Sequence, residues 1–324
     1  MNTFKGPIFI VGMPRSGTKL LRTLLNQHSK ISISSVETHF IPYLYEKFDH
    51  QCPEYPQGMK AFYDELAKTP FFRDTKRRGK FLDKATWLAA ASEFSGWADL
   101  FEFLLRFYGS KPSMNTVFGD KTPSYVTKMR ILKQEIFPHA KFIHIIRDPR
   151  DCCLSAKKLW GKNPLLFADV WHQSVKQART DAALFADSYL EIQYEALLDQ
   201  PEKILRQICQ FVGISYQAAM MTLNKSAENH GDAKNAKQIV GSNKKKYQAE
   251  LSQAVIKRIE EITFPSATKS GYSLDYAEQH RALSSINKNL LALISGYNAF
   301  RFHIREKGIR SGISYYLRLH QVTH

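Results

Sequence analysis

The sequence predicts an α/β fold in which helices flank a parallel sheet. Short apolar runs of strand length alternate along the chain with segments of helical periodicity, a pattern typical of parallel sheets. The 324 residues are 44% hydrophobic and 23% charged, close to the average of soluble globular proteins. With only 4 cysteines, 16 glycines and 13 prolines, the chain is neither a disulfide scaffold nor a collagen-like or low-complexity protein.

The individual elements can be placed in order from these patterns. An apolar run over 8–11 has the length of a buried strand, and leucines recur with helical spacing over 18–27. A proline opens the helix expected at 201–212, and Gly213 follows its end. The remaining predictions are strands at 31–34, 141–146 and 189–194 and a helix at 151–160.

Two segments depart from this alternation. Residues 43–113 are rich in aromatic side chains, and we expect a helical insertion that covers one edge of the sheet and shapes the substrate side of a site. Residues 281–324 carry seven Lys or Arg and one acidic residue, with apolar residues at helical spacing. We therefore expect a main domain over 1–275 and a basic amphipathic helical extension over 276–324. The extension would either contact a membrane or pack on the protein or a second subunit.

The segment between the first strand and the first helix, residues 12–19 with the sequence GMPRSGTK, has the features of an anion-binding loop. A glycine-bearing turn points successive backbone N–H groups inward, and the helix N-terminus adds partial positive charge. Strand, loop and helix follow one another here, which is the context that a phosphate-binding loop requires. The sheet is therefore predicted to be of the P-loop type.

This loop differs from the loop of nucleoside triphosphatases, which ends in Gly-Lys-Ser or Gly-Lys-Thr. Here the order is Gly17-Thr18-Lys19, so the lysine is turned by about 100° around the helix, and the cation within the loop is Arg15. Such a loop suits an anion that is not a triphosphate–metal complex, and we expect no metal site. A P-loop kinase or nucleotide-hydrolysing protein is the alternative interpretation.

The run Pro-Arg-Ser-Gly-Thr after a buried strand resembles the 5′-phosphosulfate loop of sulfotransferases. These enzymes move a sulfuryl group from 3′-phosphoadenosine 5′-phosphosulfate (PAPS) to an acceptor hydroxyl by in-line displacement. The resemblance implies that PAPS is the co-substrate here. The implied phosphosulfate-binding residues are Arg15, Ser16, Gly17, Thr18 and Lys19.

A second resemblance to the same family lies at the strand over 141–146. Arg147 closes this strand and Ser155 stands eight residues further on, a spacing at which family members grip the 3′-phosphate of the donor. The chemistry agrees, because an arginine fork and a hydroxyl near a helix N-terminus both suit a phosphate.

Two further motifs resemble the branch of the tyrosylprotein sulfotransferases and their bacterial relatives. That branch has a Glu-Thr dipeptide after the second strand, here beginning at Glu37, and a Lys-x-Pro element before the arginine strand, here beginning at Lys121. The resemblance implies that Glu37 is the general base, that Lys121 stabilises the leaving oxygen, and that Arg15 joins them in catalysis. His39 is the rival base, since it shares a face with Glu37 on an extended segment and other branches use histidine.

Three more residues complete the expected site. The resemblance also implies that Tyr194, at the end of the strand over 189–194, approaches the donor nucleotide, and that the basic run over 241–246, which contains Lys244, is the loop that closes over it. Asp120 is expected to tune its neighbour Lys121.

The charge balance indicates the kind of partner. A net charge of +16 favours anionic partners. The resemblance implies an acceptor hydroxyl on a glycan or a protein tyrosine, which can itself be acidic, with a lipid or small alcohol left open. The basic run over 76–80 is either a contact for that acceptor or a solvated loop. Nucleic acid is not expected, because no zinc-finger or RNA-binding signature is present.

The cellular location follows from weaker signals. No run reaches the ~18 apolar residues of a membrane span, the first residues do not resemble a secretory signal, and the cysteines are not spaced as pairs. We expect a cytoplasmic protein, with membrane association through 281–324 and homodimer formation left open.

Overall fold

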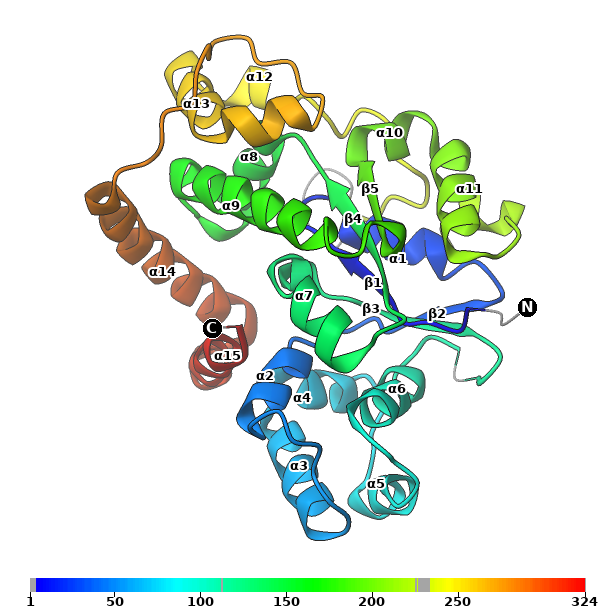
Figure 1. The fold of residues 1–324 in the computed structure, drawn as a ribbon. Coiled ribbons are helices and arrows are strands. Elements are labelled where there is room, and N and C mark those ends of the chain that lie inside the picture. The colour runs from blue at the N-terminus through cyan, green and yellow to red at the C-terminus, as the bar shows by residue number, and fades with distance from the viewer. Residues whose placement is uncertain (1–3, 112, 225, 227–233, 324) are drawn as a thin grey trace.

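The computed structural model describes residues 4–111, 113–224, 226 and 234–323 (Figure 1). Its centre is a sheet of five strands in the order β2-β3-β1-β4-β5, and every neighbouring pair is parallel. The strands are β1 (Ile8–Val11), β2 (Ile31–Ile33), β3 (Val117–Lys121), β4 (Lys141–Ile146) and β5 (Tyr189–Gln193). The predicted α/β fold is therefore confirmed.

Strand β3 is the one strand of this sheet that the apolar pattern did not predict. Its sequence, VFGDK, has only two strongly apolar residues, yet all five residues are buried. It lies between β1 and β2 in the sheet. The neighbouring strands therefore bury its residues, although its sequence is not strongly apolar. The other four strands begin and end within one residue of the predicted bounds.

The two faces of the sheet enter two different hydrophobic cores. Successive residues of a strand point to opposite faces, so Ile8 and Ile10 pack with the leucines of α1 (Thr18–Leu25) and with α11 (Pro201–Val212). Phe9 and Val11 pack instead with the aromatic residues that precede β3. Helix α11 begins at a proline and ends at Gly213, whose φ of 85° is left-handed, as expected from the sequence.

The remaining elements of the main domain complete the layers. The α-helices are α7 (Met129–Ile131), α8 (Pro149–Trp160), α9 (Pro164–Ala182), α10 (Tyr194–Asp199), α12 (Tyr247–Glu250) and α13 (Gln253–Lys269). Shorter turns are η1 (Pro123–Thr127), η2 (Leu132–Ile136), η3 (Ala186–Ser188) and η4 (Ala218–Met221). Helices α8, α9 and α13 pack on one another beyond the carboxyl ends of the strands.

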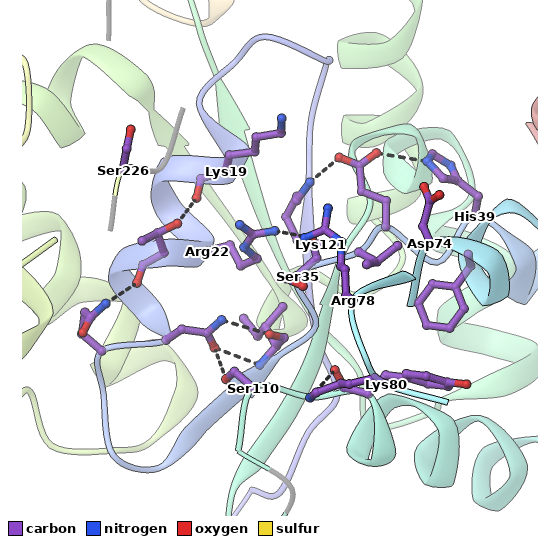
Figure 2. Close-up of a pocket in the computed structure, with 18 of the residues that line it drawn as sticks. Lys19, Arg22, Ser35, His39, Asp74, Arg78, Lys80, Ser110, Lys121 and Ser226 are labelled. Atoms are coloured by element: carbon purple, nitrogen blue, oxygen red, sulfur yellow. Dashed lines mark hydrogen bonds and ion pairs between the residues drawn. The ribbon is translucent and has the colours of Figure 1, made fainter. Parts of the chain in front are cut away.

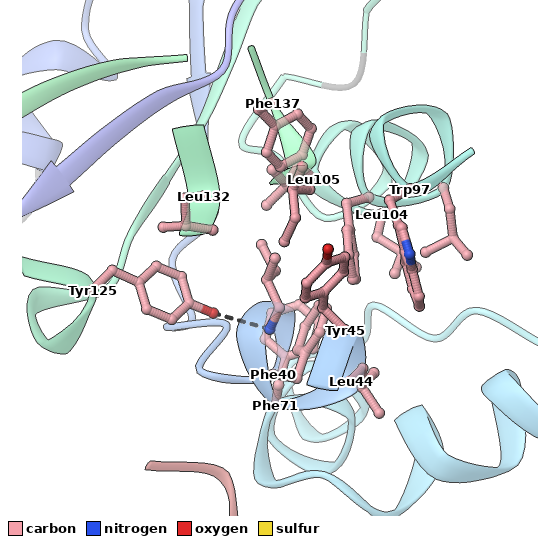
Figure 3. Close-up of a cluster of buried hydrophobic side chains, with 14 of the residues drawn as sticks. Phe40, Leu44, Tyr45, Phe71, Trp97, Leu104, Leu105, Tyr125, Leu132 and Phe137 are labelled. Atoms are coloured by element: carbon pink, nitrogen blue, oxygen red, sulfur yellow. Dashed lines mark hydrogen bonds between the residues drawn. The ribbon is translucent and has the colours of Figure 1, made fainter. Parts of the chain in front are cut away.

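The segment 43–113 is helical, as predicted. Its helices are α2 (Phe40–Lys47), α3 (Gln57–Lys68), α4 (Pro70–Arg77), α5 (Lys84–Ala91) and α6 (Trp97–Phe107). Their aromatic side chains form a cluster in which Phe40, Phe71 and Trp97 are buried (Figure 3). The same cluster includes Phe118 and Phe142 of the sheet, so the insertion covers one face of the sheet as well as its edge.

The C-terminal segment is a pair of helices, α14 (Ser285–Lys307) and α15 (Ile309–Thr323). Helix α14 contacts α8 and α9, and α15 turns back to contact α2 and α4 of the insertion (Figure 1). Within the described part of the chain, no helix combines the length and the apolar character needed to cross a bilayer. The domain boundary at 275/276 stays a prediction.

Candidate active site

The loop over 12–17 makes a tight turn at the carboxyl end of β1. Gly12 and Gly17 have positive φ angles of 148° and 91°, and Arg15 between them is left-handed with φ 76°. A Cβ atom at Gly12 would collide with the carbonyl oxygen of Ile145, and one at Gly17 would collide with the ring of Tyr194. Both glycines are therefore required where backbone of β4 and the Tyr194 ring approach the loop.

Three of the predicted donor-binding residues meet at this loop. The Arg15 Nε atom donates to the Ser155 Oγ atom at 3.0 Å. The Arg147 Nη1 atom donates to the backbone carbonyl of Arg15 at 3.2 Å. The structure thus brings together a loop arginine, the end of β4 and the first half of α8, which are far apart in the sequence.

The environment of Arg147 is almost closed. The residue is 6% exposed, its guanidinium carbon lies 4.6 Å from the centroid of the Tyr194 ring, and its Nη2 atom donates to the Asn243 carbonyl at 3.1 Å. Among the described residues, its Nε atom is buried without a hydrogen-bond partner. A buried donor is costly to leave unpaired, so this atom marks a position that an anionic ligand would complete.

The basic run over 241–246 lies beside Arg147 and Tyr194, and it contacts them through Asn243 rather than through Lys244. The Asn243 side chain donates to the Tyr194 hydroxyl at 2.8 Å, whereas Lys244 forms an ion pair with Asp199 of α10. The buried carboxylate of Asp151 accepts from the backbone N–H of Lys245 at 2.7 Å and so anchors the run. Nothing in the local sequence distinguishes Asn243 from the lysines beside it.

Two of the three predicted catalytic residues, Glu37 and Lys121, are in direct contact at the end of β3, whereas the third, Arg15, contacts Ser155. Lys121 forms an ion pair with one carboxylate oxygen of Glu37, and the His39 Nε2 atom lies 3.0 Å from the other. The Ser124 hydroxyl lies 3.3 Å from the His39 Nδ1 atom. The Thr38 N–H donates to the Thr122 hydroxyl at 3.0 Å, which fixes the Glu37 segment against the strand. Lysine, glutamate and histidine therefore form one continuous chain.

Burial and mutual electrostatic interaction set the pKa values of Lys121 and Glu37. Lys121 is only 1% exposed, whereas the Glu37 side chain is 30% exposed. Burial alone would raise the pKa of Glu37, but the Lys121 charge and the His39 hydrogen bond outweigh it and hold that pKa well below its usual range. Burial lowers the pKa of Lys121 despite the opposing effect of Glu37. Burial also raises the pKa of Asp120 to about 6.

A cavity of about 750 Å³ opens in front of the Lys121, Glu37 and His39 side chains (Figure 2). Lys121 and His39 lie on one wall, and Lys19 and Arg22 of α1 lie on another. Arg78 and Lys80 of the basic run over 76–80 line the insertion side. The cavity therefore joins the anion-binding loop, through Lys19, to the catalytic chain and the insertion.

Several lining residues of this cavity were not predicted, and two of them carry polar side chains from distant helices. Asp74 comes from α4, and Tyr315 comes from α15 at the far end of the chain. The Arg73 guanidinium lies 5.8 Å from the centroid of the Tyr315 ring. Burial, together with the charges of Asp74 and Glu37, raises the pKa of Tyr315 to about 12. The sequence gives no signal for Tyr315, because only the folded hairpin brings α15 to the insertion.

No cluster of three or more His, Cys, Asp or Glu side chains with the geometry of a metal site occurs among the residues described.

The fold and the loop define a class: a P-loop-type α/β protein with an anion-binding turn after its first strand. Two solved structures share this fold. The sulfotransferase domain of the curacin biosynthetic pathway matches with a TM-score of 0.55 and 20% identity, over 85% of this chain and 100% of that one. The sulfotransferase domain of the Synechococcus PCC 7002 olefin synthase matches with a TM-score of 0.56 and 24% identity, over 85% and 98%.

Sequence comparison defines the family within this class. A family model described as "Sulfotransferase family" matches residues 7–218, well over half of the chain. The chain belongs to the sulfotransferase family, and the resemblance seen in its motifs is confirmed.

Curated relatives agree with the branch that the motifs indicated. Protein-tyrosine sulfotransferase 1 of Danio rerio is 27% identical over 224 residues, which are 66% of this chain and 55% of that protein. Protein-tyrosine sulfotransferase 2 of Gallus gallus is 24% identical over 222 residues, which are 66% of this chain and 53% of that protein. The chain spans about half the length of these relatives.

Proposed function

We propose that this protein transfers a sulfuryl group from PAPS to an acceptor hydroxyl, with residues 1–275 as the catalytic domain. The observation that carries the proposal is the set of contacts among Lys121, Glu37 and His39, which faces a cavity that also includes Lys19, in the first turn of the helix after the loop over 12–17. The family match favours sulfuryl transfer over the kinase alternative.

The donor would be held by the loop and by the end of β4. Backbone N–H groups of Gly17 and Thr18 at the start of α1 suit the 5′-phosphosulfate, whereas the Ser16 N–H donates to the Met13 carbonyl at 3.1 Å and shapes the turn. The buried Nε atom of Arg147 and the hydroxyl of Ser155 suit the 3′-phosphate. Arg15 contacts Ser155, so its charge is shared between the two anionic ends of the donor.

The geometry favours one of the two other expected donor contacts, Tyr194, over the other, Lys244. Tyr194 stacks on the Arg147 guanidinium and closes over Gly17, which supports a role beside the nucleotide. Lys244 is turned towards Asp199, so we assign the direct contact to Asn243 and leave Lys244 to attract the donor at longer range.

The chemical step needs charge stabilisation and a proton acceptor. As the bond from sulfur to the bridging oxygen breaks, negative charge develops on the leaving phosphate, and Lys121 would stabilise it from a desolvated position. The acceptor hydroxyl gives its proton to Glu37, the more exposed member of the ion pair. His39 holds the second oxygen of Glu37 and so orients the carboxylate. The alternative is that His39 takes the proton and Glu37 orients it.

The cavity also indicates the acceptor. Its lining includes Lys19, Arg22, Arg78 and Lys80 besides Lys121, against two acidic residues, Glu37 and Asp74. An excess of positive charge supports an acidic acceptor, either a glycan or a peptide that presents a tyrosine. The basic run over 76–80 would supply part of this contact.

The experiment that tests the proposal has two parts. Thermal stability is compared with 3′,5′-adenosine bisphosphate, with ATP and magnesium, and without ligand; stabilisation by the bisphosphate alone is expected, by ~2.7 kcal/mol at about 100 times the dissociation constant. Transfer of labelled sulfate from PAPS to acidic glycans and tyrosine peptides is then measured. Arg15→Ala should lose both signals, and Lys60→Ala, an exposed lysine of α3, should keep both. Stabilisation only by ATP with magnesium would return the kinase interpretation.

A further inference from the structure

Helix α14 attaches to the protein through polar groups. The Ser295 hydroxyl accepts from the backbone N–H of Asn163 at 3.1 Å, and the Asn298 side chain donates to the Gly161 carbonyl at 2.7 Å. The Lys288 ammonium lies 2.8 Å from the Asp169 carboxylate. These contacts fix which face of α14 is turned inward, towards α8 and α9.

The opposite face of α14 is apolar and open. The five residues Ile286, Leu290, Leu293, Ile294 and Tyr297 recur at helical spacing, and their exposed fractions are 81%, 58%, 75%, 49% and 61%. We call these five residues the α14 stripe. Leu283 is buried and Leu291 packs inward, so neither belongs to this face. A continuous row of large exposed apolar side chains marks a surface that is normally covered.

The surroundings of the stripe are positively charged. Arg301 and Arg305 follow the stripe on α14, Arg281 and Arg310 lie in the segments before and after that helix, and all four are exposed. Glu306 is the single acidic residue over 281–310. Arg301 lies over the ring of Tyr297, with its guanidinium carbon 5.8 Å from the ring centroid, so a cation and an aromatic ring of the stripe face the same side. Apolar side chains and cations therefore share one surface.

We propose that the α14 stripe docks on an anionic lipid bilayer. Exposed leucine, isoleucine and tyrosine side chains suit the boundary between headgroups and acyl chains, and arginines beside them suit acidic headgroups. A second copy of this chain is the competing occupant, but it would bring the same arginine-rich surface to the interface, and like charges in apposition oppose association. The charge pattern therefore favours the lipid surface.

The position of α15 gives this surface a consequence for the proposed function, on which this step rests. Gly308 separates α14 from α15, and α15 carries Tyr315 into the wall of the cavity. A bilayer held by α14 would lie against the same hairpin that closes the cavity. The acceptor would then be a hydroxyl-bearing molecule carried by, or bound to, the membrane surface.

The test uses the full chain and co-sedimentation with vesicles. Vesicles of phosphatidylcholine alone are compared with vesicles that also contain phosphatidylserine, at low and high salt. We expect binding to the anionic vesicles that weakens with salt, and little binding to the neutral ones. Equal binding to both kinds, or no binding to either, would overturn the proposal.

Variants assign the binding to the stripe. Leu290→Glu with Leu293→Glu should reduce the bound fraction at least tenfold, and Arg301→Gln with Arg305→Gln should reduce it and flatten the salt dependence. The matched control is Leu184→Glu with Met114→Glu, which adds the same charge at exposed apolar residues outside α14 (57% and 67% exposed) and should bind like the parent.

Two control measurements distinguish lipid docking from a failure of the proposed function and from self-association. Stabilisation by 3′,5′-adenosine bisphosphate is measured on the parent and on every variant, and it reports folding and the donor site. If neither the parent nor any variant is stabilised, the result counts against the proposed function but leaves the vesicle result intact. Sedimentation velocity reports self-association. A dimer that the Leu290→Glu, Leu293→Glu variant converts to monomer, in a parent that ignores anionic vesicles, would assign the stripe to a second copy and overturn lipid docking.

Discussion

The proposed donor side and the proposed acceptor side of the site are built in opposite ways. The donor side uses backbone turns and charged residues at the carboxyl ends of adjacent strands, within the residues that match the family, and Asn243 joins them from outside. The acceptor side is a cavity walled by α1, the insertion and α15, three regions distant in the sequence. The difference teaches that donor chemistry is encoded locally, whereas acceptor shape is a product of tertiary packing.

The largest effect is expected where the two sides meet, at Glu37. Glu37→Gln removes the proposed base and leaves Lys121 without its ion pair, so kcat should fall by about 10²–10⁴-fold. Donor binding, measured by the shift in melting temperature with 3′,5′-adenosine bisphosphate, should persist. Near-normal turnover would give the base role to His39.

The pH profile sharpens the same comparison. The pKa of Glu37 is held well below 4.5, so in the free enzyme its carboxylate stays charged, and kcat/KM should not fall until the pH is well below 4.5. A loss of kcat/KM already between about pH 8 and about pH 5, the range in which histidine side chains ordinarily change charge, would contradict the assignment to Glu37.

The next effect concerns the donor side alone. Arg147→Ala removes a buried guanidinium, and we expect the dissociation constant for 3′,5′-adenosine bisphosphate to rise by about 10²-fold, as for other buried charged contacts. The matched control is Arg206→Ala, since Arg206 also lies over a tyrosine ring, that of Tyr216, but its side chain is 59% exposed. Calorimetric titration measures both. Unchanged affinity in Arg147→Ala would refute the 3′-phosphate role.

A smaller effect, on the stability of the folded protein, is expected from substitution of Asp120, the residue before Lys121 in β3. Burial raises the pKa of this carboxyl from 3.8 to about 6. A raised pKa means that the ionised form is disfavoured in the folded state, so stability is lost as the pH rises from about 4 to about 6. Asp120→Asn should remove that loss, worth roughly 3 kcal/mol at neutral pH at about 1.36 kcal/mol per pKa unit. Unfolding by denaturant at pH 4 and pH 7 measures it, and equal gains at both values would exclude a titration effect.

The smallest effect is expected on the acceptor side. Tyr315→Ala opens the cavity wall, and the KM for the best acceptor found in the screen should rise by about tenfold, the cost of losing one well-packed aromatic contact. The KM for PAPS should not change. Tyr315→Phe should behave like the parent if the ring forms the wall. A rise in the KM for both substrates would show that α15 supports the whole fold instead.

The same contrast explains what the sequence could predict. The loop, Arg147 and the Glu37–Lys121 pair could be singled out because each is a short motif beside a strand, and their roles stay predictions. Strand β3 was missed as a strand, because VFGDK owes its burial to its neighbours, although its final lysine was found by motif. Asn243 and Tyr315 were missed because no local pattern marks them. Lys244 was predicted in the right loop, but the fold turns its side chain towards Asp199.

The place of Tyr315 in the cavity wall also matters for biosynthesis. A ribosome releases the loop and both halves of the catalytic chain long before α15 emerges. A nascent chain, or one shortened by proteolysis within the hairpin, would therefore hold the residues for the donor but lack the last wall around the acceptor. Completion of the hairpin would then decide when the protein begins to select among acceptors.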